Sequence, residues 1–305
     1  MSFKIKIPDE MSERLPRGRS GFTANHHYDT FRKMLFNIVE EQQPMTVRQV
    51  FYQAVVRDWV EKTEHGYGYI QRDLVSMRWS GMLDLDWIID TSRTIRGSQG
   101  ANQSVDEFMN GLYERIPLGH VRDLLADHDF SIQVWLEKEA LAGVIHPATS
   151  EWDVPLYCAR GYSSLSFLHE AAKDLETKDR PARIFHFGDY DPSGQDAIAT
   201  VQRDLPLLAP KTASHGFEFT IVAVKPEQVA ELGLPTRPTK RTDTRASSFG
   251  SDQSVELDAI PPNTLRQMVN STLRGCFKRG ARKANEARQE AEREEIRQRL
   301  RRLRR

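Results

Sequence analysis

The stretch RIFHFGDYDPSGQDAIATVQRDL, residues 183–205, decides the fold class, because a short apolar run leads through two aspartates into a helical pattern. The same alternation continues on both sides of it. Further apolar runs of strand length are SIQVWLE (131–137), VPLYCA (154–159) and FEFTIVAV (217–224), and helical patterns separate them. Strands that alternate with helices are typical of βαβ units in a parallel sheet. We therefore predict an α/β domain with a mainly parallel sheet over residues 130–225.

The rest of the chain divides into four segments around this domain. Residues 1–27 mix Pro, Gly, Ser and charged residues, which predicts a flexible arm. Residues 28–96 show three helical patterns followed by the apolar run DWIIDTSR (86–93), which we interpret as a strand. This order indicates a winged-helix-like DNA-binding domain, although an unspecialised helical domain fits it too. Residues 97–129 are expected to form a linker with one helix (SVDEFMNGLYERI), and residues 226–305 a C-terminal extension with a basic helix.

The composition excludes several classes of protein. The 305 residues carry 43 basic and 43 acidic side chains, which argues against a protein that coats DNA through its overall charge. The charge is uneven, because residues 278–305 contain 12 Lys or Arg and only 5 Asp or Glu. No stretch reaches the roughly 18–20 apolar residues that cross a bilayer, and the N-terminus lacks an apolar signal segment. With only Cys158 and Cys276, a disulfide framework is not expected, and we predict a cytoplasmic protein without a membrane partner.

Three carboxylates are placed to meet at one edge of the predicted sheet. Glu137 ends the first strand, and Asp189 and Asp191 follow the third. If these strands are neighbours, the side chains converge, and their repulsion requires a cation or a shared proton. Hard oxygen ligands of this kind favour Mg²⁺. The stretch DPSG also has a purely structural interpretation, because it forms a good turn and Asp191 can cap the following helix.

Other catalytic motifs do not occur in the sequence. It contains no GxxxxGK[ST] phosphate loop, so ATP hydrolysis by this chain is not expected. Ser163 and Ser164 lie in RGYSSL, which lacks the GxSxG pattern of a nucleophilic serine, and we interpret them as a helix cap. The nine histidines show no zinc-binding spacing.

The acidic residues belong to a set that resembles a known domain. Glu137 and Lys138 in VWLEKEAL, the glycine turn ARGYSS (159–164) and the acidic GDYDPSG (188–194) have the order and spacing of a Toprim domain. The set is most similar to the Toprim domain in the A subunit of topoisomerase VI and in its relative, the meiotic double-strand-break transesterase.

A second segment resembles the same family. TVRQVFYQ (46–53) is similar to the part of those proteins in which an arginine lies four residues before the nucleophilic tyrosine, here Arg48 and Tyr52. One helical turn separates the two side chains, so both can address the same phosphate. The resemblance covers roughly residues 28–225. Because the chain is shorter than we expect of a full A subunit, it looks like a reduced, orphan relative.

The resemblance implies a Rossmann-like Toprim fold and the reaction of a type IIB topoisomerase. The phenol of Tyr52 would attack a backbone phosphorus of double-stranded DNA, expel the 3′-hydroxyl and leave a 5′-phosphotyrosyl link. It implies that Arg48 and the Glu137-Lys138 pair are catalytic. It also implies that the three carboxylates bind Mg²⁺, which would supply positive charge together with Arg48.

The resemblance also implies partners. In the family, the tyrosine of one protomer meets the metal site of the other, so a homodimer is expected. Full topoisomerase activity would require a separate ATPase subunit of the B type. A DNA-cleaving protein of this kind is expected in the cytoplasm in association with the nucleoid.

Tyr52 has a structural alternative. Phe51 and Trp59 lie on the apolar stripe of the predicted helix, and Tyr52 lies about 100° away from it, so Tyr52 can be a packing residue instead. In that case Tyr67 and Tyr69 are the next candidate nucleophiles.

Several arginines are expected to contact DNA phosphates rather than bases, namely Arg57, Arg72 and Arg78 in the helical domain and Arg299, Arg301 and Arg302 in the terminal helix. The terminal helix can also be a solvated single helix held by charge pairs. Two other functions fit the sequence. One is a Toprim nuclease that hydrolyses DNA or RNA with metal-activated water and does not need Tyr52. The other is a non-catalytic DNA-binding or scaffold component of a mobile element or defence system.

Overall fold

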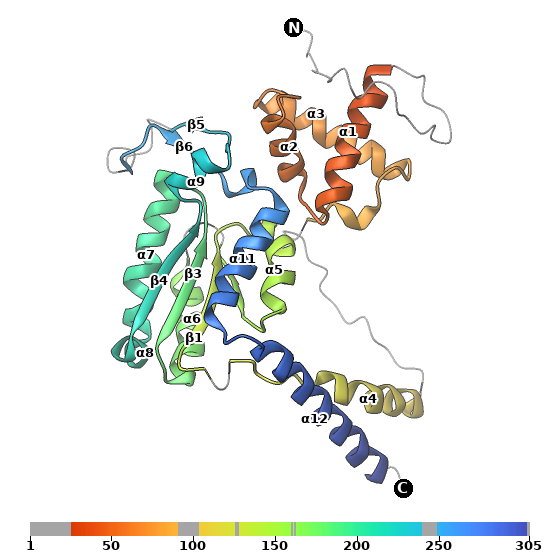
Figure 1. Ribbon diagram of the computed structural model, residues 1–305, viewed down its shortest axis with the longest axis vertical. Helices are drawn as coiled ribbons and strands as arrows, with labels where there is room; N and C mark the ends of the chain where they lie inside the picture. Colours follow the sequence, from red (N-terminus) through yellow and green to blue (C-terminus); the bar gives the residue numbers. More distant parts are fainter. Residues whose placement is uncertain are drawn as a thin grey trace.

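A four-stranded parallel sheet lies at the centre of the larger part of the molecule (Figure 1). The computed structural model describes residues 26–90, 104–125, 128–159, 161, 163–239 and 249–303. The strands lie in the order β2-β1-β3-β4, and their bounds are β1 (Ser131–Leu136), β2 (Leu156–Cys158), β3 (Ala182–Phe187) and β4 (Phe217–Ala223). Every neighbouring pair in this sheet is parallel. The prediction of an α/β domain with a mainly parallel sheet is confirmed.

Helices cover both faces of the sheet, because successive strand side chains point into different apolar cores. The covering helices are α5 (Ala142–Ser150), α6 (Leu165–Lys178), α7 (Pro192–Leu208), α8 (Pro210–His215) and α11 (Pro262–Cys276). Val134 and Leu136 of β1 belong to the core on the α5 and α11 side. Trp135, between them in sequence, belongs to the core on the α6 and α7 side. All six residues of β1 are buried, and β1 pairs in parallel with β3 from end to end, so the carboxyl ends of the two strands lie at one edge.

Three helices precede the sheet, α1 (His26–Gln42), α2 (Val47–Val56) and α3 (Glu64–Trp79). Thr46 begins α2 with a capping box, in which its hydroxyl accepts the N–H of Gln49 and the Gln49 side chain accepts the N–H of Thr46. The apolar faces of these helices form a core that is continuous with the α5 and α11 face of the sheet. The three predicted helices are confirmed, and the winged-helix assignment and the domain boundaries stay predictions.

The strand predicted at residues 86–93 is wrong for the part that the structure describes. Residues Leu85–Trp87 form a 3-10 helix, η2, and Ile88 makes only an isolated bridge to Met45. Met45 lies in the short connection between α1 and α2, so no strand is available there to continue the pairing. Residues 91–93, like residues 1–25 of the predicted arm and residues 160 and 162 of the glycine turn, lie outside the described residues.

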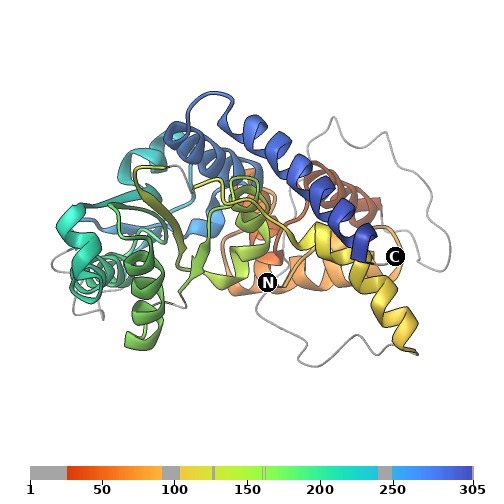
Figure 2. The same cartoon turned by 90° about the horizontal axis from the view of Figure 1, so that it is seen from below.

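The helix predicted in the linker and the basic terminal helix pair with each other. They are α4 (Val105–Gly119) and α12 (Ala281–Leu303), and they lie side by side at the end of the molecule away from β5 and β6 (Figures 1 and 2). Glu292 of α12 joins them, because it contacts His120 at 2.7 Å and Arg122 at 2.6 Å. Within the described residues, no helix combines the length and the apolar character needed to span a membrane.

The chain after β4 folds back onto the carboxyl edge of the sheet. It forms α9 (Pro226–Glu231), a short antiparallel pair of β5 (Arg237–Pro238) and β6 (Gln253–Ser254), and the 3-10 helix η4 (Leu257–Ala259). Val255 and Tyr190 exchange two backbone hydrogen bonds of 2.9 Å, which fasten this segment directly after β3. The same segment contacts α2, so it lies between the helical part of the chain and the sheet.

Candidate functional site

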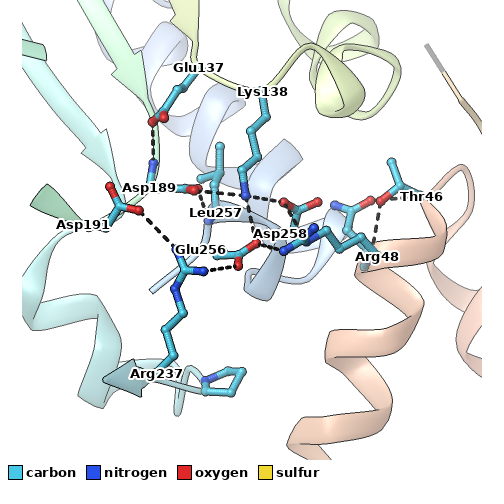
Figure 3. Close-up of polar contacts among 12 residues, drawn as sticks. Thr46, Arg48, Glu137, Lys138, Asp189, Asp191, Arg237, Glu256, Leu257 and Asp258 are labelled. Carbon is cyan, nitrogen blue, oxygen red and sulfur yellow. Dashed lines mark hydrogen bonds and ion pairs between the residues drawn. The ribbon is translucent and has the colours of Figure 1, made fainter. Parts of the chain in front are cut away.

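The structure brings Glu137, Asp189 and Asp191 together at the carboxyl edge of the sheet. Because β1 and β3 are neighbouring parallel strands, the residues that follow them leave the sheet at the same edge. The backbone N–H of Asp189 donates to Oε2 of Glu137 at 2.8 Å (Figure 3). A Cβ atom built on Gly194 would lie 3.3 Å from that oxygen and 3.4 Å from Oδ1 of Asp191, so both oxygens face one small space.

Two glycines keep this space open. A Cβ atom on Gly188 would lie 2.6 Å from Oε2 of Glu137, and one on Gly194 would lie 2.6 Å from the carbonyl oxygen of Asp189. Neither distance is compatible with a side chain, because non-bonded carbon and oxygen atoms stay more than about 3 Å apart. The glycines of GDYDPSG therefore allow the close approach of the carboxylates.

Asp191 also has the structural role that its sequence allows. Its Oδ1 accepts the N–H of Gly194 at 2.8 Å and the hydroxyl of Ser193 at 2.7 Å, which caps α7. Its Oδ2 pairs with Arg237 at 3.2 Å. The Asp191 carboxylate thus caps the N-terminus of α7 and also takes part in an ion pair at the edge of the sheet.

The two remaining carboxylates of this group differ in their partners. Asp189 accepts the N–H of Leu257 on Oδ1 at 2.8 Å and pairs through Oδ2 with Lys138 at 3.1 Å. Glu137 accepts the backbone bond from Asp189 and, within the part of the chain that the structure describes, forms no ion pair with a Lys or Arg side chain. Burial, followed by the charge of Asp189, raises the pKa of Glu137 to about 7. Burial also raises the pKa of Asp189, so both Glu137 and Asp189 resist ionisation.

A second acidic pair, which was not identified from the sequence, completes the site. Glu256 and Asp258 flank Leu257 at η4 and are 4% and 1% exposed. Lys138 bridges them, with its Nζ 3.1 Å from Oε2 of Glu256 and 2.7 Å from Oδ2 of Asp258. Burial alone would lower the pKa of Lys138, but the charges of Asp258, Asp189 and Glu256 raise it. In the sequence the pair is the short pattern ELD, which by itself does not indicate a contact with Lys138.

Arg48 of α2 reaches the same acidic pair. Its Nη2 lies 2.5 Å from Oε2 of Glu256, and its Nε lies 3.9 Å from Oδ2 of Asp258. The side chain is 49% exposed, so its guanidinium lies between the carboxylate and solvent. Oε2 of Glu256 therefore contacts both Arg48 and Lys138, and through it α2 is joined to the segment that follows β1 (Figure 3).

Tyr52 lies one turn beyond Arg48 and is buried, with 2% of its surface exposed. Its ring contacts Phe51 at a centroid distance of 5.5 Å, and the ammonium of Lys62 lies 5.1 Å from its centre. Burial, together with the charge of Glu256, raises the pKa of Tyr52 to about 12, although Arg48 opposes the shift through its charge and a side-chain hydrogen bond. The ring packs as the structural alternative predicts, while the hydroxyl faces an arginine.

Two further cations border the site and were not identified from the sequence. Arg237 of β5 contacts Oε1 of Glu256 and Oδ2 of Asp191, both at 3.2 Å. Lys62 donates to the carbonyl oxygen of Pro235 at 3.0 Å. Burial lowers the pKa of Lys62, and the charges of Arg237 and Arg48 act in the same direction. The resulting surface has four basic side chains around a buried acidic pair.

The contacts within one chain bear on the expected arrangement of protomers. The resemblance implies that the tyrosine of one protomer acts at the carboxylates of its partner. In the structure, Arg48 of the tyrosine helix and Lys138 of the sheet meet on Glu256 of the same chain. The helix with Tyr52 is thus docked beside its own acidic edge.

The partners of the carboxylates also test whether Mg²⁺ fits. The carboxylate oxygens have the hard-ligand chemistry that Mg²⁺ prefers. Both oxygens of Asp189 and both oxygens of Asp191 already have protein partners, however, and Lys138 and Arg237 supply positive charge there. In the part of the chain that the structure describes, no group of three or more His, Cys, Asp or Glu side chains is arranged to hold a metal ion. The carboxylate oxygens suit Mg²⁺ by their chemistry. In the structure, however, Lys138 and Arg237 already pair with the two aspartates.

The other predicted contact residues lie in different surroundings. Arg57 ends α2, where it donates to the Gln53 carbonyl at 3.0 Å, and its guanidinium lies 5.7 Å from the ring centre of Trp59. On α3, Arg72 is exposed and Arg78 is half-buried. The basic residues of α12 lie far along the chain at the opposite end of the molecule (Figure 1), where Arg299 and Arg301 pair with glutamates of the same helix and Arg302 is exposed.

The alternative nucleophiles take part in aromatic packing on α3. Tyr67 contacts Phe51 edge to face, with the ring centres 5.5 Å apart. Tyr69 contacts Phe31 with the ring centres 5.5 Å apart. Tyr52 lies one helical turn from Arg48, which contacts the acidic pair at η4, so Tyr52 is the candidate nucleophile that the arrangement favours.

The chain was also compared with known proteins. No model of a protein family matches it, and no curated protein matches its sequence.

Proposed function

We propose that this chain cleaves DNA by transesterification through Tyr52, in the manner of the topoisomerase VI A subunit. The observation that carries the proposal is the meeting of Arg48 and Lys138 on one oxygen of Glu256. These two cations come from the two segments that resemble the family, and they lie 90 residues apart in the chain. If Tyr52 were only a packing residue, Arg48 would not need to contact the acidic residues at the edge of the sheet.

In the proposed reaction, the oxygen of Tyr52 forms a bond to a backbone phosphorus of DNA, and the bond from phosphorus to O3′ breaks. The phenol loses its proton and the departing O3′ takes one up, so the step is balanced without a further reactant. The product is a 5′-phosphotyrosyl link, which keeps the phosphodiester energy and allows religation without ATP. Arg48, one helical turn away, would donate to the non-bridging oxygens of that phosphate.

If Tyr52 is the nucleophile, it would need activation, because its hydroxyl resists ionisation in the state that the structure describes. With a pKa of about 12, about one phenol in a hundred thousand is ionised at pH 7. Because burial and the charge of Glu256 raise this pKa, a reactive state would need positive charge nearer to the hydroxyl. The basic side chains of Arg48 and Lys62 already lie beside Tyr52. They would supply this positive charge once the negative charge of Glu256 no longer offsets it.

Mg²⁺ is part of the proposal. Glu137, Asp189 and Asp191 would hold it, in exchange for the contacts that Lys138 and Arg237 make with the two aspartates. When bound, the ion would add positive charge beside the reacting phosphate. One Tyr52 cuts one strand, so a double-strand break requires two copies of the chain, and we propose a homodimer on double-stranded DNA, associated with the nucleoid. Strand passage would require a separate ATPase subunit.

The test is the covalent product. Supercoiled DNA is incubated with the protein and Mg²⁺, stopped with detergent and run on a denaturing gel. We expect protein attached to 5′ ends with the unaltered chain and none with Tyr52→Phe, which keeps the ring contacts of Tyr52. Tyr67→Phe is the matched control, because it removes a hydroxyl from the neighbouring aromatic ring, and it should keep the adduct. An adduct that persists in Tyr52→Phe would refute the proposed nucleophile.

The burial of Tyr52 specifically favours a second candidate function. A nuclease that uses metal-activated water needs the carboxylates at the sheet edge but no exposed phenol, and Tyr52 is 2% exposed. The same gel separates the two functions, because hydrolysis leaves clean 5′-phosphates with both the unaltered chain and Tyr52→Phe. Retained DNA without Mg²⁺-dependent breakage, and no effect of Glu137→Gln, would instead identify a non-catalytic DNA-binding or scaffold protein.

A further inference from the structure

Glu256 has three cationic partners that come from three separate parts of the chain. Arg48 belongs to α2, Lys138 follows β1 and Arg237 lies in β5 (Figure 3). Arg48 and Lys138 contact Oε2 of Glu256, at 2.5 and 3.1 Å, and Arg237 contacts Oε1 at 3.2 Å. Both oxygens of one buried carboxylate are therefore held by cations whose positions depend on the whole fold.

This donor set matches the chemistry of a backbone phosphate. Two guanidinium groups and an ammonium group around a pair of anionic oxygens form the arrangement by which proteins bind phosphodiesters. The side chains of Arg48 and Arg237 are 49% and 32% exposed, whereas that of Glu256 is 5% exposed. The two arginines can thus be reached from solvent, and the carboxylate lies beneath them, whereas the Lys138 side chain is 23% exposed.

We propose that Arg48, Lys138 and Arg237 form a binding site for a phosphodiester of the DNA backbone, and that Glu256 occupies this site when DNA is absent. The inference deepens the proposed function and rests on it, because it names the group that binds beside Tyr52. It adds Arg237 and Glu256 to the site, and neither residue belongs to the segments that resemble the topoisomerase family.

The exchange has a consequence for the helix that carries Tyr52. The contacts of Arg48 with Glu256 and Asp258 fasten α2 to η4. A phosphate that takes the place of the Glu256 carboxylate transfers Arg48 to the DNA and releases this connection. The binding of the substrate then removes an ionic contact between α2 and η4, while the apolar core keeps α2 beside the sheet.

The position of Arg237 depends on a further contact across the same boundary. Lys62, in the connection that follows α2, donates to the carbonyl oxygen of Pro235 two residues before Arg237. Arg237 also contacts Oδ2 of Asp191 at 3.2 Å, so it stays beside the sheet edge when Glu256 leaves. A phosphate bound there would lie between the tyrosine helix and the carboxylates that follow β3.

The test measures DNA affinity without a divalent metal. A fluorescent duplex is titrated with the full chain in EDTA at several salt concentrations, and anisotropy gives the dissociation constant. Glu256→Gln removes the internal competitor and keeps the side-chain shape, so it should bind the duplex at least about threefold more tightly than the unaltered chain. Glu218→Gln is the matched control, because it removes a glutamate from an exposed pair with Arg183, and it should not change the affinity. A folded Glu256→Gln that binds no more tightly overturns the proposal.

A second variant keeps the proposal testable if Glu256→Gln does not fold. Arg237→Gln removes one cation of the site from a partly exposed position on β5. We expect weaker binding of the duplex. The negative slope of log affinity against log salt should become shallower by about 0.9, as for the loss of one phosphate contact. Unchanged affinity and slope in Arg237→Gln overturn the proposal, and so does an unaltered chain that binds no duplex.

These results separate this inference from the proposed function. If Glu256→Gln binds more tightly but no adduct with Tyr52 forms, the phosphate site stands and the transesterification fails. If the adduct forms but Glu256→Gln gains no affinity and Arg237→Gln loses none, the phosphate site fails and the transesterification stands.

Discussion

Lys138→Met tests the ionic centre of the site, because it removes one ammonium group from three buried carboxylates at nearly constant volume. Lys138 lies 2.7 Å from Asp258 and 3.1 Å from each of Asp189 and Glu256. Removing one partner of a buried ion pair costs about 3–5 kcal/mol, since the other charge stays buried and uncompensated. Glu256 keeps two arginine partners, but within the described residues the remaining cation beside Asp258 is Arg48 at 3.9 Å. We therefore expect the free energy of unfolding at pH 7 to fall by about 3–4 kcal/mol.

The assay is urea denaturation followed by circular dichroism, with the slope of each transition compared before the free energies are. The deficit should shrink at pH 4, where the stranded carboxyl groups begin to take up protons. Lys173→Met is the matched control, because Lys173 forms an exposed pair with Glu170 at 2.9 Å, and no measurable loss is expected. If Lys138→Met is no less stable than Lys173→Met, the ion pairs at Lys138 do not hold the site together.

Three further substitutions test other features of the site. The pKa of Glu137 in the folded chain is about 7, above its ordinary value of 4.5, so the folded chain binds more protons than the unfolded chain between these pH values. The free energy of unfolding therefore falls as the pH rises from 4.5 to 7. Glu137→Gln should make this fall smaller by up to about 3 kcal/mol, measured by denaturation at pH 5 and pH 8. Gly194→Ala should lower the free energy of unfolding by about 1–3 kcal/mol, because its Cβ would lie 2.6 Å from a backbone oxygen. Gly275→Ala in α11 is the control: its Cβ would meet nothing within 4 Å, and it should stabilise the chain by up to about 1 kcal/mol. Equal melting temperatures of the two variants would contradict the close approach at Gly194. Asp191→Ala should cost about 1 kcal/mol through the lost cap of α7, and Asp191→Asn should recover most of it in the same thermal melts.

Local patterns in the sequence determined the framework of this protein. The alternation of apolar runs and helical patterns predicted the parallel sheet, because periodicity reports which residues face a core. The placement of Glu137, Asp189 and Asp191 after strands predicted that they would share one edge, since parallel neighbours end together. The predicted strand at residues 86–93 failed for the described residues, because a short apolar run becomes a strand only where a partner strand lies beside it.

The tertiary structure alone decided which further residues belong to the site. Glu256 and Asp258 lie 118 and 120 residues from Lys138, and nothing in their local sequence indicates that contact. Ion pairs impose no periodicity on the chain, so Arg48, Lys138 and Arg237 could be matched to Glu256 only after folding placed η4 between α2 and the sheet. The burial of Tyr52 was settled in the same way, because packing depends on which surface covers a helix face and not on the helix pattern itself.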